Sequence, residues 1–175
     1  MIDIKKNVEI GKSLAGLQLG SNLSIFLPYI DTVIDGEDVP WTVMIEQNNN
    51  GKLLYKIPDN NGFIVYVNMP KLELGFTEKG NLYYIRAGVG YMGEIFKGVK
   101  IGSKISEIKN QLYLDDTEDV HYLVENGEII EGIMFFAGGL EVEEDPDNKD
   151  EKIILNFLPE YNTDGNGFPK HMLAK

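Results

Sequence analysis

Gly16-Leu-Gln-Leu-Gly-Ser-Asn-Leu-Ser-Ile-Phe26 recurs 82 residues later as Gly98-Val-Lys-Ile-Gly-Ser-Lys-Ile-Ser-Glu-Ile108. The two stretches share apolar residues, glycine and serine at matching positions, which indicates an internal repeat. Each copy predicts a short extended piece, a glycine turn and then a helix. Ser21 and Ser103 are the predicted caps, because a serine hydroxyl can satisfy a free amide in the first turn of a helix.

Leu27 extends the apolar face of the first predicted helix and Leu112 that of the second, and Pro28 ends or kinks the first helix. Strand patterns follow each predicted helix. Between polar turns, the residues either alternate between apolar and polar or form short apolar runs, and both patterns are typical of strands. The predicted strands cover residues 41–47, 52–57, 63–68, 71–76 and 82–87 in the first half, and 120–125, 128–136, 140–143 and 152–157 in the second. Asn126-Gly127 is the strongest hairpin signal of the chain.

The predicted fold class is therefore α+β, with two similar units of a short helix plus an antiparallel β-meander. Residues 1–88 form the first unit, residues 89–158 the second, and residues 159–175 a loosely ordered tail. The few helices pack on a mostly antiparallel sheet. The two units lie side by side or share one sheet in a single compact domain.

Acidic residues are concentrated in one part of the chain. Fifteen Asp and Glu residues lie between Asp115 and Glu160 against two lysines, whereas the whole chain of 175 residues has a net charge of −12. The negative electrostatic field of such a stretch attracts basic proteins and repels nucleic acid and anionic membranes. We therefore expect no nucleic-acid partner, and no stretch is apolar enough to span a membrane. The absence of cysteine and of a secretory signal predicts a cytoplasmic location.

Three patterns resemble sites for catalysis or metal binding. Gly88-Val-Gly-Tyr-Met-Gly93 matches the glycine pattern of dinucleotide sites, but no predicted helix follows it to hold a pyrophosphate, so a connector is the better interpretation. Residues 144–151 and 162–167 carry oxygen ligands that would suit calcium. His121 is interpreted as a surface strand residue beside carboxylates. The sequence predicts no enzyme, no cofactor and no metal site, and calcium binding stays open as an alternative.

The acidic stretch also contains aromatic residues. Tyr113 and Tyr122 flank one group of acids, and a second group follows the apolar run at residues 133–136. Aromatic side chains within a charged surface favour protein binding, because charge speeds encounter and rings supply affinity. The predicted partner-binding residues are Asp115, Asp116, Glu118, Asp119, Tyr122, Glu141, Glu143 and Glu144.

The repeat motif, with a short helix and then strands, resembles the helix–meander repeats of β-lactamase-inhibitor-like domains. It also resembles small immunity proteins encoded beside bacterial polymorphic or contact-dependent growth inhibition toxins, and the acidic, cysteine-free chain fits these better. The resemblance implies a non-enzymatic inhibitor that captures a cognate basic toxin domain, often a nuclease. The alternative is a binding or regulatory module of the same repeat fold, without a toxin partner, in which the acidic residues only increase solubility.

Overall fold

The computed structural model describes residues 2–36, 51–58, 62–68, 71–108, 111–115, 120–138 and 152–159. Within these ranges the protein is mostly sheet, with one short α-helix and two 3₁₀ turns, in agreement with the broad α+β class that the sequence predicts. Every helix in the described part is too short or too polar to cross a bilayer.

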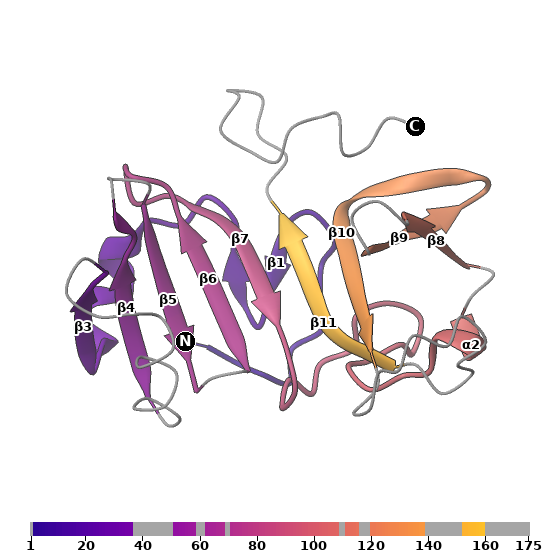
Figure 1. Cartoon of the computed structure of the whole chain (residues 1–175), viewed down its shortest axis with the longest axis horizontal. Coiled ribbons are helices and arrows are strands. Elements are labelled where there is room, and N and C mark those ends of the chain that lie inside the picture. Colours follow the sequence, from indigo (N-terminus) through magenta and orange to yellow (C-terminus); the bar gives the residue numbers. More distant parts are fainter. Residues whose placement is uncertain are drawn as a thin grey trace.

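A nine-stranded mixed sheet dominates the structure (Figure 1). Its strands, in spatial order, are β3 (Thr32–Asp35), β4 (Lys52–Lys56), β5 (Phe63–Val67), β6 (Leu72–Phe76), β7 (Leu82–Ala87), β11 (Lys152–Pro159), β10 (Glu128–Gly138), β9 (Val120–Glu125) and β8 (Leu112–Asp115). All neighbours are antiparallel except β3 and β4, which are parallel.

The sheet consists of two four-stranded meanders and an added edge strand. Strands β4 to β7 form the first meander and β8 to β11 the second, and the meanders meet where β7 pairs with β11. The final described strand of the chain therefore lies in the middle of the sheet. The predicted strands at residues 41–47 and 140–143 lie outside the described residues, as does the tail after Pro159, which is the last residue of β11.

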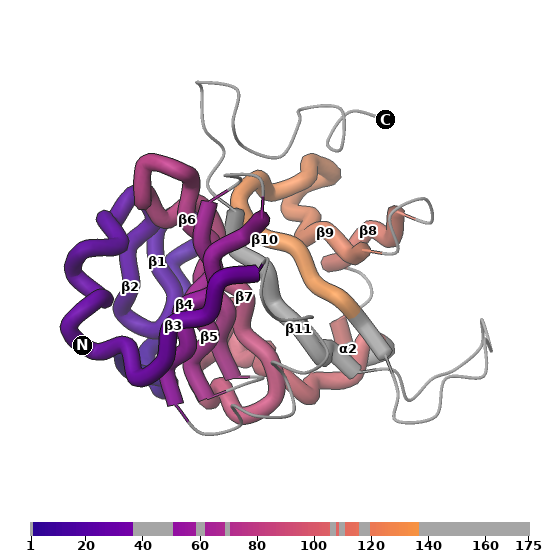
Figure 2. Tube along the Cα trace, turned by 60° about the vertical axis from the view of Figure 1, so that its left-hand side comes forward, coloured from indigo at the N-terminus to yellow at the C-terminus, as the bar shows by residue number. Residues whose placement is uncertain are grey.

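The N-terminal segment covers one face of the sheet (Figure 2). It contains a small hairpin of β1 (Ser13–Leu14) and β2 (Leu17–Gln18), followed by the 3₁₀ turns η1 (Leu23–Ile25) and η2 (Leu27–Tyr29). The main hydrophobic core lies beneath this layer and continues below the connection that follows β7. It includes Leu14 from the hairpin, Leu74 and Ile85 from the first meander, and Phe135 from the second, all with no exposed surface.

The predicted helix of the first repeat copy is wrong. The structure has two consecutive 3₁₀ turns there, and Asn22 caps the first by accepting a hydrogen bond from the amide of Ser24 at 3.0 Å. Ser21 is therefore not the cap. The three-residue spacing that predicted an α-helix is also the repeat of a 3₁₀ turn, and Pro28 in the first turn of η2 limits further helix.

The second copy forms only the four-residue helix α2 (Ile105–Ile108). Ser103 accepts a hydrogen bond at its hydroxyl from the amide of Lys100, within the preceding turn. Leu112 belongs to β8 and does not extend a helix. A helix this short gains little from its own hydrogen bonds and is held by packing, here through the buried Ile108.

The two stretches nevertheless share one kind of backbone turn. Ala15 and Gly16 both have positive φ, and so do Lys97 and Gly98 at the matching positions of the second copy. Two consecutive residues of this kind form the tight turn that suits the twist of paired strands. The turn joins β1 to β2 in the first copy and closes the bridge between Phe96 and Val99 in the second.

Candidate functional site

The candidate partner-binding surface lies at the β8 end of the sheet. Of the eight predicted residues, the structure describes Asp115 and Tyr122. Asp115 is the half-buried last residue of β8 and lies opposite Val120. Asp116, Glu118, Asp119, Glu141, Glu143 and Glu144 lie outside the described residues.

Strand β8 forms one edge of the described sheet and carries exposed apolar side chains. Tyr113 is 46% exposed and Leu114 42% exposed. Neighbouring residues of a strand point to opposite faces, so apolar surface is presented on both sides of this edge. An edge strand with such side chains can pair with another chain, a tendency that soluble proteins usually suppress. Within the described part of the chain, β8 thus combines an edge position with exposed apolar side chains.

Tyr122, predicted as an aromatic anchor, is instead a core residue. It is 1% exposed and clusters with Tyr84, Val120 and Met134. It faces Tyr113 across the β8–β9 ladder. The difference in exposure arises because Tyr113 belongs to the edge strand and Tyr122 to the next one in. Tyr113 is thus the accessible ring at this surface.

His121 is also buried, which corrects its interpretation as a surface residue. Only 9% of its surface is exposed. It lies opposite Leu114 in β8 and Phe135 in β10. These positions place it on the core-facing side of β9, because Phe135 belongs to the main core.

Three further carboxylates lie on the β9–β10 hairpin. Glu125, Glu128 and Glu131 are exposed. Asn126 and Gly127, both with positive φ, form the predicted turn and place Glu125 opposite Glu128. Like charges in this arrangement repel each other. Lys97 offsets the repulsion by binding Glu125 at 2.9 Å.

The ion pair links the hairpin to the second repeat turn, to which Lys97 belongs. The hydrogen bond from Lys97, together with its positive charge, lowers the pKa of Glu125 below the ordinary glutamate value. Glu125 therefore stays ionised to lower pH. The described hairpin thus presents stable negative charge beside the apolar β8 edge.

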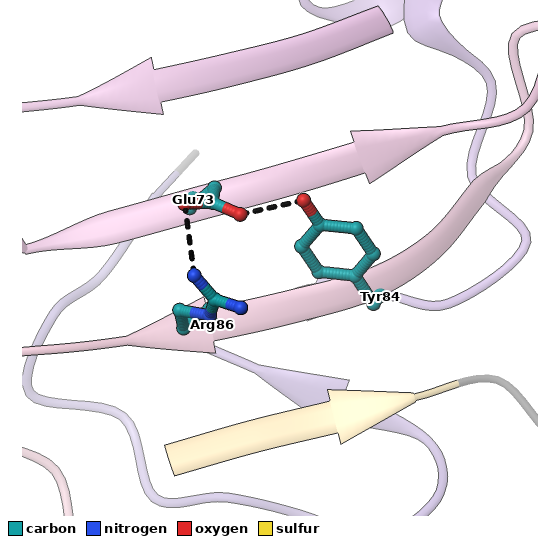
Figure 3. Close-up of polar contacts among 3 residues, drawn as sticks. All are labelled: Glu73, Tyr84 and Arg86. Carbon is teal, nitrogen blue, oxygen red and sulfur yellow. Dashed lines mark hydrogen bonds and ion pairs between the residues drawn. The ribbon is translucent and has the colours of Figure 1, made fainter. Parts of the chain in front are cut away.

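Sequence reasoning missed a polar cluster on the first meander (Figure 3). Glu73 of β6 accepts a hydrogen bond from the Tyr84 hydroxyl at 2.5 Å, and its other oxygen lies 3.4 Å from Nη1 of Arg86. The Arg86 guanidinium carbon also lies 5.8 Å from the centre of the Phe136 ring, within range of a cation–π contact. Arg86, which joins the two meanders in this way, is the only arginine of the chain, and that was the available signal.

The surroundings of this cluster favour neutral tyrosine. Burial raises the pKa of Tyr84 above its ordinary value, and the Glu73 charge and hydrogen bond raise it further. Burial likewise raises the pKa of Tyr66, again with a contribution from Glu73. Gly75 leaves room for the Tyr84 ring, because a Cβ atom there would overlap it. The cluster is therefore a packed structural unit in which tyrosine donates to a carboxylate.

The other sequence patterns do not form a site in the described part of the chain. The glycine-rich segment 88–93 leads to a turn and not to a helix, and its Tyr91 is buried with its hydroxyl donating to the backbone oxygen of Lys6. This agrees with its interpretation as a connector. Within the described ranges no three potential ligands gather as a metal site. Both calcium candidates, 144–151 and 162–167, lie outside those ranges.

Comparison of the chain with protein-family models, with curated proteins and with solved structures yields no match.

Proposed function

We propose that this protein is a non-enzymatic, cytoplasmic immunity protein that binds and neutralises a basic bacterial toxin domain. The observation that carries the proposal is the β8 edge, where exposed Tyr113 and Leu114 lie beside the start of the acidic stretch. Exposed apolar side chains at this edge of the described sheet supply contact area. The surrounding negative charge selects a basic partner.

Electrostatics supports the choice of partner. The stretch from Asp115 to Glu160 carries fifteen acidic residues and two lysines, so the remainder of the chain is close to neutral. Charges act over roughly 8 Å at physiological salt. The field of these acids speeds encounter with a positively charged domain most at low salt. A nuclease with a basic active site is a partner of this kind.

The mode of binding that fits the edge is strand addition. A partner segment that pairs with β8 would gain main-chain hydrogen bonds, while side chains on each face of the strand provide specificity. Tyr113 and Leu114 would contact the partner on opposite faces of the extended sheet. The carboxylates of the β9–β10 hairpin would lie near the same contact.

The two-unit architecture is part of the proposal. It is supported by matching positive φ values at Ala15–Gly16 and Lys97–Gly98, and by a four-stranded meander after each copy. In this interpretation, residues 1–88 and 89–158 are related units joined through β7 and β11. The second unit then carries the binding surface, while the first has a nearly neutral surface.

The Glu73 cluster is not proposed as an active site. Its carboxylate binds Tyr84 and Arg86 within the sheet, and burial together with Glu73 raises the pKa of Tyr84 away from physiological pH. A general acid or base works best with a pKa near the working pH. The described geometry therefore favours a structural role.

Co-expression with a toxin domain tests the function, and the candidate to try is any such domain that a neighbouring gene encodes. We expect the full chain to restore growth of cells that express the toxin domain and to bind that domain in isothermal titration calorimetry. Changing Asp115, Glu128 and Glu131 to lysine should weaken binding tenfold or more and reduce its dependence on salt, because favourable long-range charge is reversed. Tyr113→Ser should weaken binding with little change in the salt dependence.

The matched control reverses Glu9, Glu78 and Glu94, three acids of the chain outside the acidic stretch, so that both variants have the same net charge. This control should bind like the unchanged protein. Equal weakening by the two triple variants would show that only total charge matters and would reject the β8 surface. A lack of protection by a well-folded unchanged chain would reject the immunity function itself.

A further inference from the structure

A cavity of about 540 Å³ lies between the N-terminal layer and the first meander, far along the sheet from β8. Leu17, Phe26 and Val65 form part of its inner lining, and all three are buried core residues. This volume is within the range of small-molecule sites, which are mostly apolar with a few placed polar groups.

The two 3₁₀ turns shape the outer wall of the cavity. Phe26, at the junction of η1 and η2, is fixed in the core by an edge-on contact with Phe76 at 5.4 Å between ring centres. Its neighbours in the turns, Ile25 and Tyr29, line the cavity but remain 56% and 65% exposed. The opening of the cavity therefore has an apolar rim. The side chains of this rim are exposed to water unless a ligand covers them.

Among the described residues that line the cavity, Lys52 is the one that carries a charge. Strand alternation places it on the same face of β4 as Leu54, which belongs to the main core. Two hydrogen bonds to Asp31, both of 2.8 Å, fix its backbone. The Lys52 amide donates to the Asp31 carboxylate, and the Asp31 amide donates to the Lys52 carbonyl. Among the described residues, Lys52 makes no ion pair. A lysine with a fixed backbone thus lies among the mostly apolar described residues of the lining.

We propose that this cavity binds a small amphipathic monocarboxylate, with its apolar body among Leu17, Phe26 and Val65 and its carboxylate on the Lys52 ammonium. Charge complementarity selects the anion, because the lining residues that the structure describes include a cation and no acid. Outside residues 115–160, which include none of the described lining residues, the chain is close to neutral. The inference is independent of the proposed function, because the cavity and the β8 edge use different parts of the sheet.

Methyl NMR of the full chain, titrated with octanoate, octanol and octylamine, tests this site. We expect octanoate to shift the methyl signals of Ile25, Ile30 and Val65 and to bind more tightly than octanol, whereas octylamine binds most weakly. Hexanoate, with two methylenes fewer, should bind roughly fifteenfold more weakly, because each buried methylene contributes about fourfold. Shifts spread over the surface, or equal binding of the three head groups, would overturn the proposal.

Variants of β4 then isolate the role of Lys52. Lys52→Met should lower octanoate affinity roughly tenfold and leave octanol affinity unchanged, and Lys52→Glu should reverse the preference in favour of octylamine. Lys56→Met removes the same charge from the same face of β4 at an exposed position outside the lining and should bind octanoate normally. Unchanged octanoate affinity in folded Lys52→Met would reject the carboxylate site. If neither Lys52 variant folds, the head-group series on the unchanged chain decides.

Discussion

At the scale of single residues, Glu73 is a charged residue whose carboxylate is largely buried. Its side chain is 16% exposed and that of Arg86 is 34% exposed, so the carboxylate is largely removed from water while the guanidinium is partly solvated. Burying a carboxylate is unfavourable unless charge and hydrogen bonds compensate for lost hydration. Tyr84 and Arg86 provide both. The three residues therefore depend on one another, although they come from two strands.

We expect Glu73→Gln to lower the free energy of unfolding by about 1–3 kcal/mol, because Arg86 loses its counter-charge but keeps some contact with water. Tyr84→Phe should cost about 1 kcal/mol, since it removes one hydrogen bond and keeps the ring. Glu78→Gln, at an exposed turn, should change stability by less than about 0.5 kcal/mol. Urea denaturation measures all three, and a Glu73→Gln variant as stable as the Glu78→Gln control would contradict the role assigned to the cluster.

At the scale of elements, the repeat turns are the clearest local feature. Gly98 has φ of +86° and no atom would contact a Cβ placed there. Gly98→Ala should therefore destabilise the protein by about 1–2 kcal/mol through backbone conformation alone. Gly98→Asn should cost less, because asparagine tolerates this conformation better. Chemical denaturation measures the free energy of unfolding of both variants and shows which is less stable. If both lose the same stability, the positive φ of the turn does not determine the loss.

The strands were largely predictable, whereas the helices were not. The described strands β4 to β7 and β9 to β11 lie where polar turns separate apolar runs, and Asn126-Gly127 forms the predicted hairpin. Strands β3 and β8 were missed because they are four residues long and follow segments with apparent helical spacing. Such spacing cannot distinguish a 3₁₀ turn from one turn of α-helix, and tertiary packing decides between them.

The sequence pointed to Tyr122 as the aromatic contact of the candidate site, whereas the structure exposes Tyr113. Tyr113 and Tyr122 both lie beside acids in the sequence, and they face each other in the structure. Which ring is exposed depends on which strand lies at the edge of the sheet, and strand order is a property of the whole chain. The Glu73 cluster was hidden for a similar reason, since its partners meet only after β6 and β7 pair.

At the scale of the whole molecule, buried tyrosines determine stability in alkali. Burial raises the pKa of Tyr66 and Tyr84 well above the ordinary 10.0, and raises that of Tyr91 to about 12. The folded state therefore keeps these protons at pH values where the unfolded chain releases them. The contribution of these tyrosines to the free energy of unfolding is complete below about pH 10. It is lost as pH rises further, because the unfolded chain then releases their protons more readily than the folded state.

We expect the free energy of unfolding to fall above about pH 10, by as much as about 1.4 kcal/mol per pH unit for each of these tyrosines. Phenolate absorbance should rise together with the loss of folded structure. Tyr91→Phe should make the decline less steep between about pH 10 and 12, even if it lowers stability at neutral pH. Stability that stays constant across this range would contradict the burial of these hydroxyl groups.

The pairing of β7 with β11 has a consequence for the order in which the chain is made. β7 ends at Ala87, and the strand that covers its open edge begins at Lys152. At about 5–20 residues per second, a ribosome needs several seconds to synthesise the residues between them. Throughout that time the first meander exposes an unpaired edge, which is a site for mispairing with other nascent chains. Slow translation after β7 should therefore lower the yield of folded protein, whereas a chaperone that shields the edge should restore it.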